Sequence, residues 1–408
     1  PRLMGVIPWG EIAGEAALLT DEKRASTIHA ARDSDLVKLS KSAFERICEK
    51  YPQVMMKISR ILIKRFENRE KRVMQRNIAV NIAVLPASPE VRIADFTNKL
   101  ASALSSHGST FLLTARKIDK LFNKKNIARI SDDDPRSPGL SAWLIETESI
   151  HSFVIYRAEN NASPWTKRCL ARADKVLVVG DAHASPEPGV IEQELLRKDP
   201  ESISSGRFLI LLHRDASGMP SGTADWLDKR WVQRHYHIRW ERKEDFERLA
   251  RILSDRAIGL ALGGGSAKGI AHIGIIRALE EAGVPIDLIG GTSMGAIIGA
   301  KYAMGDNYKG ILEMARRLFI DMNPFNEYTI PIISLLRSRK IEEMGKIAYG
   351  DTEIEDLWLN FFCTSSNLTT SKLKVHRRGP VWEAVRASSA MPGVVTPVIR
   401  EGEIYVDG

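Results

Sequence analysis

The chain has 408 residues, a formal net charge of +8 and a hydrophobic fraction of 44%. This length predicts two or three domains, and the composition is that of an ordinary globular protein. Three widely spaced cysteines without C-x-x-C spacing argue against a disulfide framework or a zinc site and favour the cytoplasm. No apolar run is long enough to span a bilayer. The modest positive charge fits an anionic surface or a solvated basic helix, and no nucleic-acid partner is predicted.

Residues 1–46 combine short strand-like runs with glycine turns. The spacing from Gly14-Glu15 to Arg24-Ala25 resembles the phosphate-binding cassette of cyclic-nucleotide-binding domains. This resemblance implies that Glu15 binds the ribose 2′-hydroxyl and that Arg24 pairs with the cyclic phosphate, which suits its planar guanidinium. A partial β-roll is expected, since there is little chain before Gly14. It either binds a cyclic nucleotide within a longer protein or is a barrel remnant that binds nothing.

The next segment, Ala43 to Arg76, places apolar residues at helical spacing among charges, which predicts a helix. In cyclic-nucleotide-binding domains a helix at this place closes over the nucleotide. The same segment can equally join two domains, and residues 47–76 are assigned as a connecting helix.

Residues 77–256 alternate strand-like runs with helical or irregular stretches, which predicts a Rossmann-like α/β domain with a parallel sheet. The runs lie at 82–85, 110–114, 152–156, 175–179 and 208–212. Residues 86–89 follow the first run without a glycine cradle for phosphate, so this domain is expected to be structural. His235 and His237 share one face of a short strand. Without a convergent carboxylate or cysteine, they are expected to pack rather than to bind a metal.

The last predicted domain, residues 257–408, opens with an apolar strand that runs into Gly263-Gly264-Gly265. Glycines can turn their backbone N–H groups toward an oxyanion. The predicted oxyanion loop comprises Gly263, Gly264, Gly265, Lys268 and Gly269. Two nucleotide-binding motifs fail here, because Lys268 replaces the last glycine of G-x-G-x-x-G and Ile270-Ala271 replaces the Lys-Ser/Thr pair of a P-loop.

A second apolar strand runs into Gly291-Thr292-Ser293-Met294-Gly295, which fits a nucleophile elbow. Its glycines are needed because a Cβ would clash across the turn, and the helix N-terminus after the serine favours developing negative charge. Farther along, the short apolar strand 404–406 leads into Asp407. The sequence therefore predicts Ser293 as a nucleophile and Asp407 as its base.

Four motifs together resemble, in order and spacing, the patatin-like phospholipases. They are Gly263–Gly274, Gly291–Gly295, Val385–Gly393 and Asp407-Gly408. The resemblance implies a three-layer α/β/α domain, incomplete at its C-terminus, and a Ser-Asp dyad that needs no histidine, metal or cofactor. Lys268 stands where that family more often has arginine, which keeps the charge but not a bidentate contact.

With its upstream segments, the chain resembles proteins of the neuropathy target esterase and bacterial lysophospholipase type. That resemblance implies a phospholipid or lysophospholipid substrate, and it allows regulation by a cyclic nucleotide.

Two rival interpretations stay open. A Ser-acid-His triad could use His376, the only histidine after Ser293, with Asp351 or Asp356 as the orienting acid. Alternatively, the chain is a non-catalytic sensor or scaffold that responds to a cyclic nucleotide. The intact Ser293, glycine loop and Asp407 argue against the second.

An apolar run, Tyr328–Leu336, is followed by Arg337, Arg339 and Lys340. Buried packing is the ordinary outcome for such a run. The basic rim also fits a segment that dips into a membrane interface near the catalytic mouth. The chain is therefore predicted to be cytoplasmic, either free or bound peripherally to a membrane.

Overall fold

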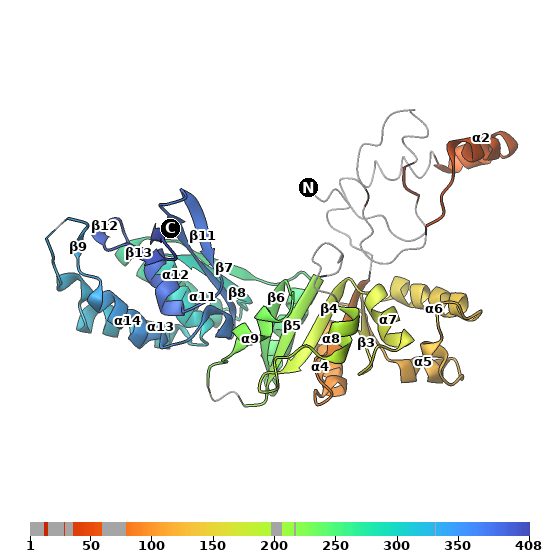
Figure 1. Cartoon of the computed structure of the whole chain (residues 1–408), viewed down its shortest axis with the longest axis horizontal. Coiled ribbons are helices and arrows are strands. Elements are labelled where there is room, and N and C mark those ends of the chain that lie inside the picture. Colours follow the sequence, from red (N-terminus) through yellow and green to blue (C-terminus); the bar gives the residue numbers. More distant parts are fainter. Residues whose placement is uncertain are drawn as a thin grey trace.

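The computed structural model describes residues 12–14, 28, 36–58, 79–196, 206–215, 218–330 and 332–408. The predicted nucleotide contacts Glu15, Arg24 and Ala25 lie outside these ranges, and only Gly14 is described, with a φ of 87° that favours glycine. Beyond residue 79 the described chain forms two α/β lobes, each built on its own sheet (Figure 1). Within the described ranges no helix is long and apolar enough to cross a bilayer.

The helix predicted from Ala43 to Arg76 is interrupted near its start. Helix α2 (Lys41–Lys50) ends before Tyr51, whose backbone is not helical, and helix resumes over residues 53–58. Pro52 has no N–H to donate and disfavours a helical residue before it. The apolar periodicity continues across this break, which is why the prediction of one continuous helix was wrong. The rest of the predicted helix lies outside the described residues.

The first lobe contains a six-stranded parallel sheet in the order β2-β3-β1-β4-β5-β6. The strands are β1 (Val80–Pro86), β2 (Thr110–Leu113), β3 (Phe153–Arg157), β4 (Lys175–Asp181), β5 (Gly206–His213) and β6 (Arg234–Arg239). Ile82 and Val84 join one apolar cluster, whereas Ala83 and Leu85 join another, because successive side chains face opposite sides of a sheet. Both faces are covered, and the predicted parallel α/β layer is confirmed.

Helices pack on both faces of this first sheet. They are α4 (Ile93–Ser105), α5 (Ala115–Leu121), α6 (Ser137–Ile150), α7 (Pro164–Ala171), α8 (Val190–Leu195), α9 (Thr223–Asp228) and α10 (Lys243–Leu253). Phe96 of α4 and Leu249 of α10 contribute to one apolar cluster, while Ile118 of α5 and Leu144 of α6 contribute to the other.

The second lobe is built on a mixed sheet in the order β13-β14-β10-β8-β7, with β11 also paired to β10. Its strands are β7 (Gly259–Leu262), β8 (Leu288–Thr292), β10 (Asn360–Asn367), β11 (Lys372–His376), β13 (Val398–Arg400) and β14 (Glu403–Asp407). A separate two-stranded sheet pairs β9 (Ser334–Leu336) with β12 (Gly393–Val395). The helices are α11 (Ala271–Glu281), α12 (Met294–Ala303), α13 (Tyr308–Arg316), α14 (Arg339–Tyr349) and α15 (Val381–Ser388).

Strand β10 has one edge that two other strands share. Its residues Asn360–Thr364 pair with β8 in parallel, and its residues Ser365–Asn367 pair with β14 in antiparallel orientation. Strand β11 pairs with residues 363–367 of β10, so it must occupy the opposite edge. The C-terminal ends of β8 and β14 therefore meet head to head, where Thr364 is followed by Ser365.

Histidines of the first lobe contact a loop of the second. The Nε2 atoms of His235 and His237 each lie 2.8 Å from the carbonyl oxygen of Glu355. A carbonyl only accepts, so both Nε2 atoms carry hydrogen, and the Nδ1 of His237 is left to accept from the Nε2 of His213 at 2.9 Å. Burial lowers the pKa of His237, and it lowers the pKa of His213 to about 4, so this chain of imidazoles is neutral at pH 7.

A buried carboxylate, Asp287, joins α10 to the start of both β7 and β8. Arg251 of α10 donates to both of its oxygens, at 2.6 to 3.0 Å, and the backbone N–H of Ile258 donates to one of them at 2.9 Å. The backbone N–H of Asp287 returns a bond to the Ile258 carbonyl. This contact holds in place the strand that leads to Ser293.

We expect Asp287→Asn to lower the free energy of unfolding by about 3 kcal/mol, because it leaves the Arg251 guanidinium without its buried counterion. Glu281→Gln is the matched control, since Glu281 pairs with Arg277 on the surface. That change should cost less than about 1 kcal/mol. Urea unfolding followed by tryptophan fluorescence checks both, and equal losses in the two variants would contradict the role given to Asp287.

Candidate active site

Ser293 lies at the turn between β8 and α12 in a backbone conformation that side chains rarely adopt, with φ 55° and ψ −122°. The turn is tight on both sides. A Cβ on Gly291 would lie 2.3 Å from the carbonyl carbon of Gly295, and one on Gly295 would lie 2.2 Å from the carbonyl oxygen of Leu262. Only glycine fits at these two positions, as expected for a nucleophile elbow.

The side chains of Ser293 and Asp407 come together at the junction of β8 and β14. The Oγ of Ser293 donates to Oδ2 of Asp407 at 2.7 Å. Burial raises the pKa of Asp407 above its usual value, although the bonds from Ser293 and from the backbone of Gly408 act in the opposite direction. A carboxylate with a raised pKa is a better proton acceptor than an exposed one.

The predicted oxyanion loop lies beside the serine. A Cβ on Gly264 would be 3.3 Å from the Cβ of Ser293, so the loop approaches the nucleophile closely. None of the hydrogen bonds within the described residues uses the backbone N–H of Gly264 or Gly265. The carbonyl of Gly263 accepts from Nε2 of His272 at 2.9 Å, which holds the loop from behind. Two N–H groups are thus available near Ser293.

The remaining loop residues have other surroundings. Gly269 is buried against Met294, whose Cβ would be 2.6 Å from a Cβ at that position. Lys268 is exposed, and its backbone N–H donates to the carbonyl of Gly265. Met294 was not among the predicted oxyanion residues. It begins α12, so its backbone N–H donates to no carbonyl within the helix. In nucleophile elbows this N–H is an oxyanion donor.

A segment at the end of α15 holds both members of the pair. The backbone N–H of Ser293 donates to Oγ of the fully buried Ser388 at 2.9 Å, and the backbone N–H of Asp407 donates to the carbonyl of Ala390 at 2.9 Å. Sequence reasoning recognised the motif that contains these residues but gave them no role. Helix α15 ends at Ser388, so this residue lies at the helix C-terminus.

Two groups of the rival triad, His376 and Asp356, have other partners. His376 shares a 2.7 Å hydrogen bond with Oγ of Ser365, and Oδ1 of Asp356 accepts the backbone N–H of Thr223 at 3.0 Å. Burial lowers the pKa of His376 to about 4. An imidazole with that pKa has no advantage over a carboxylate as a general base.

No group of three or more His, Cys, Asp or Glu side chains in the described part of the chain could hold a metal ion. His235 and His237 use their Nε2 atoms on Glu355, as described above.

Comparison with known families assigns both lobes. The profile of the neuropathy target esterase family P-loop like domain matches residues 79–244, and that of patatin-like phospholipase matches residues 260–408. A solved structure, VipD from Legionella pneumophila, aligns with 37% of this chain and with 46% of its own chain, at 18% identity and a TM-score of 0.28.

Curated relatives align with the whole chain. It is 33% identical to "Patatin-like phospholipase domain-containing protein 7" of Rattus norvegicus, over 100% of this chain and 33% of the relative. It is 32% identical to "Patatin-like phospholipase domain-containing protein 6" of Homo sapiens, over 100% of this chain and 33% of the relative. It is also 32% identical to "Lysophospholipase NTE1" of Chaetomium globosum, over 98% of this chain and 31% of the relative. The chain spans about a third of the length of these relatives. The predicted resemblance is confirmed: the chain carries a neuropathy target esterase family P-loop like domain followed by a patatin-like phospholipase domain.

Proposed function

We propose that this chain is a serine esterase that hydrolyses the acyl ester of a lysophospholipid or phospholipid, with Ser293 as nucleophile and Asp407 as base. The observation that carries the proposal is the 2.7 Å hydrogen bond from Oγ of Ser293, held in a strained elbow, to the Asp407 carboxylate. The name of the relative "Lysophospholipase NTE1" supports the substrate class.

In the acylation step, Oγ of Ser293 attacks the ester carbonyl while its proton passes to Asp407. The carbonyl oxygen becomes an oxyanion, which the backbone N–H groups of Gly264, Gly265 and Met294 stabilise. Collapse of this intermediate breaks the bond to the alcohol. Asp407 returns the proton to the departing alkoxide, and the acyl group stays on Ser293.

In the deacylation step, water attacks the acyl carbonyl and gives its proton to Asp407. A second oxyanion forms in the same place and collapses to release the fatty acid, while the proton returns to Oγ of Ser293. No imidazole takes part, so the pKa of Asp407 and the oxyanion donors carry the work that a triad histidine does elsewhere.

The proposal extends to regulation and location. A cyclic nucleotide bound through Glu15 and Arg24 would regulate the esterase, and adding cyclic AMP or cyclic GMP to the hydrolysis assay tests this. A cytoplasmic chain that binds a membrane peripherally would reach its substrate there.

We expect Ser293→Ala and Asp407→Asn each to lower kcat for lysophosphatidylcholine hydrolysis by on the order of a thousandfold or more, because each removes a group that acts on the reacting atoms. His376→Ala is the control for the rival triad and should change kcat by less than about tenfold. Fatty-acid release is measured. If His376→Ala abolishes release while Asp407→Asn retains it, in folded variants, the dyad is wrong.

The pH dependence of kcat/KM follows from the raised pKa of Asp407. The base acts only when ionised, so activity should fall as pH drops through that pKa, with a midpoint above the value of about 3.9 for an ordinary aspartate. Because folding raises this pKa, the charged carboxylate opposes folding at neutral pH. Asp407→Asn should therefore abolish activity without lowering the melting temperature at pH 7. A large loss of stability would contradict this account.

Ser388→Ala tests the support of the elbow. It removes the acceptor of the buried Ser293 N–H and should lower kcat by roughly tenfold with little change in KM, through misplacement of Oγ. Ser389→Ala is the matched control. In the described part of the chain that hydroxyl donates only to carbonyls within α15, so its loss should leave kcat unchanged. Ser388→Thr, which keeps a hydroxyl, should retain more activity than Ser388→Ala. Equal kcat values for the two alanine variants would refute the positioning role.

A further inference from the structure

The chain between α13 and α14 exposes an unusual number of large apolar side chains. They are Ile320, Phe325, Tyr328, Ile330, Ile332, Ile333 and Leu335, here named the apolar tip. Ile330 is 77% exposed and Ile332 is 85% exposed, whereas Ile289 and Ile298 of the neighbouring core are buried. The ordinary expectation of buried packing for this run is therefore wrong. Monomeric proteins rarely leave such a patch uncovered without a binding role.

Cations flank the apolar tip. Residues 316–340 contain five basic and two acidic side chains. Arg316, Arg317, Arg337 and Arg339 are exposed and are here named the basic rim. Among the described residues none of these four arginines forms an ion pair, so their charges are available to a partner. An apolar cluster bordered by unpaired cations complements a surface that is anionic outside and apolar beneath.

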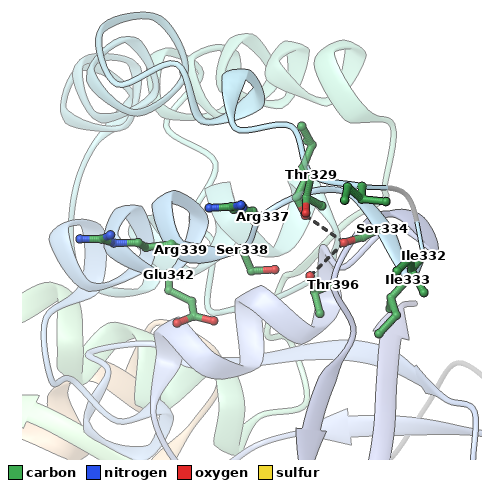
Figure 2. Close-up of a pocket in the computed structure, with 11 residues that line it drawn as sticks. Thr329, Ile332, Ile333, Ser334, Arg337, Ser338, Arg339, Glu342 and Thr396 are labelled. Atoms are coloured by element: carbon green, nitrogen blue, oxygen red, sulfur yellow. Dashed lines mark hydrogen bonds between the residues drawn. The ribbon is translucent and has the colours of Figure 1, made fainter.

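A cavity of about 480 Å³ is lined in part by Ile330, Ile332 and Ile333 of the apolar tip. Figure 2 shows Arg337 and Arg339 on one side of it and Ile332 and Ile333 on the other. The Oγ of Ser338, also in its lining, is buried and has no hydrogen-bond partner among the described residues. Cationic and hydroxyl groups beside isoleucines match the chemistry of a phospholipid, whose phosphate adjoins its acyl chains. The one carboxylate among the lining residues, that of Glu342, is paired with Arg386.

This surface is connected directly to the candidate active site. Strand β9, at the end of the apolar tip, pairs with β12. The residues just before β12 include Ser388 and Ala390, which hold Ser293 and Asp407. A bilayer that covers the apolar tip would therefore adjoin, through β9 and β12, the segment that holds the nucleophile.

We propose that the apolar tip and the basic rim form the surface on which this chain docks onto an anionic phospholipid bilayer. The isoleucines enter the boundary between headgroups and acyl chains, and the arginines pair with lipid phosphates. The proposal rests on the proposed function for its purpose, since the substrate lies in that bilayer, but binding itself requires no hydrolysis.

Vesicle flotation of the full chain tests the proposal, with Ser293→Ala as the background so that no lipid is consumed. Vesicles of phosphatidylcholine with phosphatidylserine should bind the chain more tightly than vesicles of phosphatidylcholine alone. A variant with Ile330→Ser, Ile332→Ser and Ile333→Ser should lose about tenfold or more in binding at any salt concentration. The double variant Arg337→Gln, Arg339→Gln should bind vesicles about tenfold more weakly than the parent at low salt. At high salt the two should bind alike, because screening also weakens the electrostatic part of the parent's binding.

Matched controls lie elsewhere on the surface. Leu373→Ser on β11 replaces a side chain that is 65% exposed, and Arg116→Gln with Arg242→Gln removes two exposed charges of the first lobe. These variants should bind vesicles like the parent, and thermal melting confirms that each variant is folded. Unchanged binding by the isoleucine variant would overturn the proposal, as would an equal loss in the Leu373→Ser control. If the parent does not bind vesicles and the isoleucine variant disrupts a dimer, the surface binds a second copy of the chain instead.

Hydrolysis of a water-soluble short-chain ester by the unmodified chain separates this proposal from the proposed function. Tip-dependent vesicle binding without ester hydrolysis would support docking and refute the esterase. Ester hydrolysis without vesicle binding would overturn docking and leave the esterase standing.

Discussion

The candidate active site depends on one shared edge of β10. Strands β8 and β14 pair with consecutive stretches of that edge and run toward each other, so their last residues meet. The two side chains that meet there, Ser293 and Asp407, are 114 residues apart in the chain. A shift of either strand by one residue would turn its side chains to the other face of the sheet. The register of the two strands therefore sets the position of the Ser293 side chain relative to the Asp407 side chain.

That geometry carries a cost in stability. Ser293 has a positive φ, which disfavours any residue with a Cβ, and Asp407 keeps a carboxylate where burial raises its pKa. Neighbouring contacts offset these costs. Ser388 and Ala390 accept the two backbone N–H groups, and the glycines at 291 and 295 leave room for the turn. Strain and a perturbed carboxylate in one place are typical of a site selected for chemistry rather than for stability.

The P-loop like lobe supports the second lobe through polar contacts. Arg251 binds Asp287 at the entry to β8, and His235 and His237 bind the loop at Glu355. The carboxyl end of β1, where related sheets often bind phosphate, is closely approached by Gly189, since a Cβ there would lie 2.3 Å from the carbonyl oxygen of Ala87. The structural role expected for this lobe stays a prediction.

The sequence by itself determined the elements whose requirements are local. The steric demands of the elbow fall within five residues, and parallel strands buried on both faces produce continuous apolar runs, so both were predictable from pattern. Only the tertiary structure decided which groups hydrogen-bond to the residues of the site. Nothing near Ser388 in the chain marks it as the acceptor for Ser293, and the pKa of His376 depends on burial between strands. The exposure of Ile330 and Ile332 was equally undecided, because an apolar run is compatible with a core or a surface. Hydrogen bonds and burial between distant segments arise only once the strands have paired, and local pattern does not encode them.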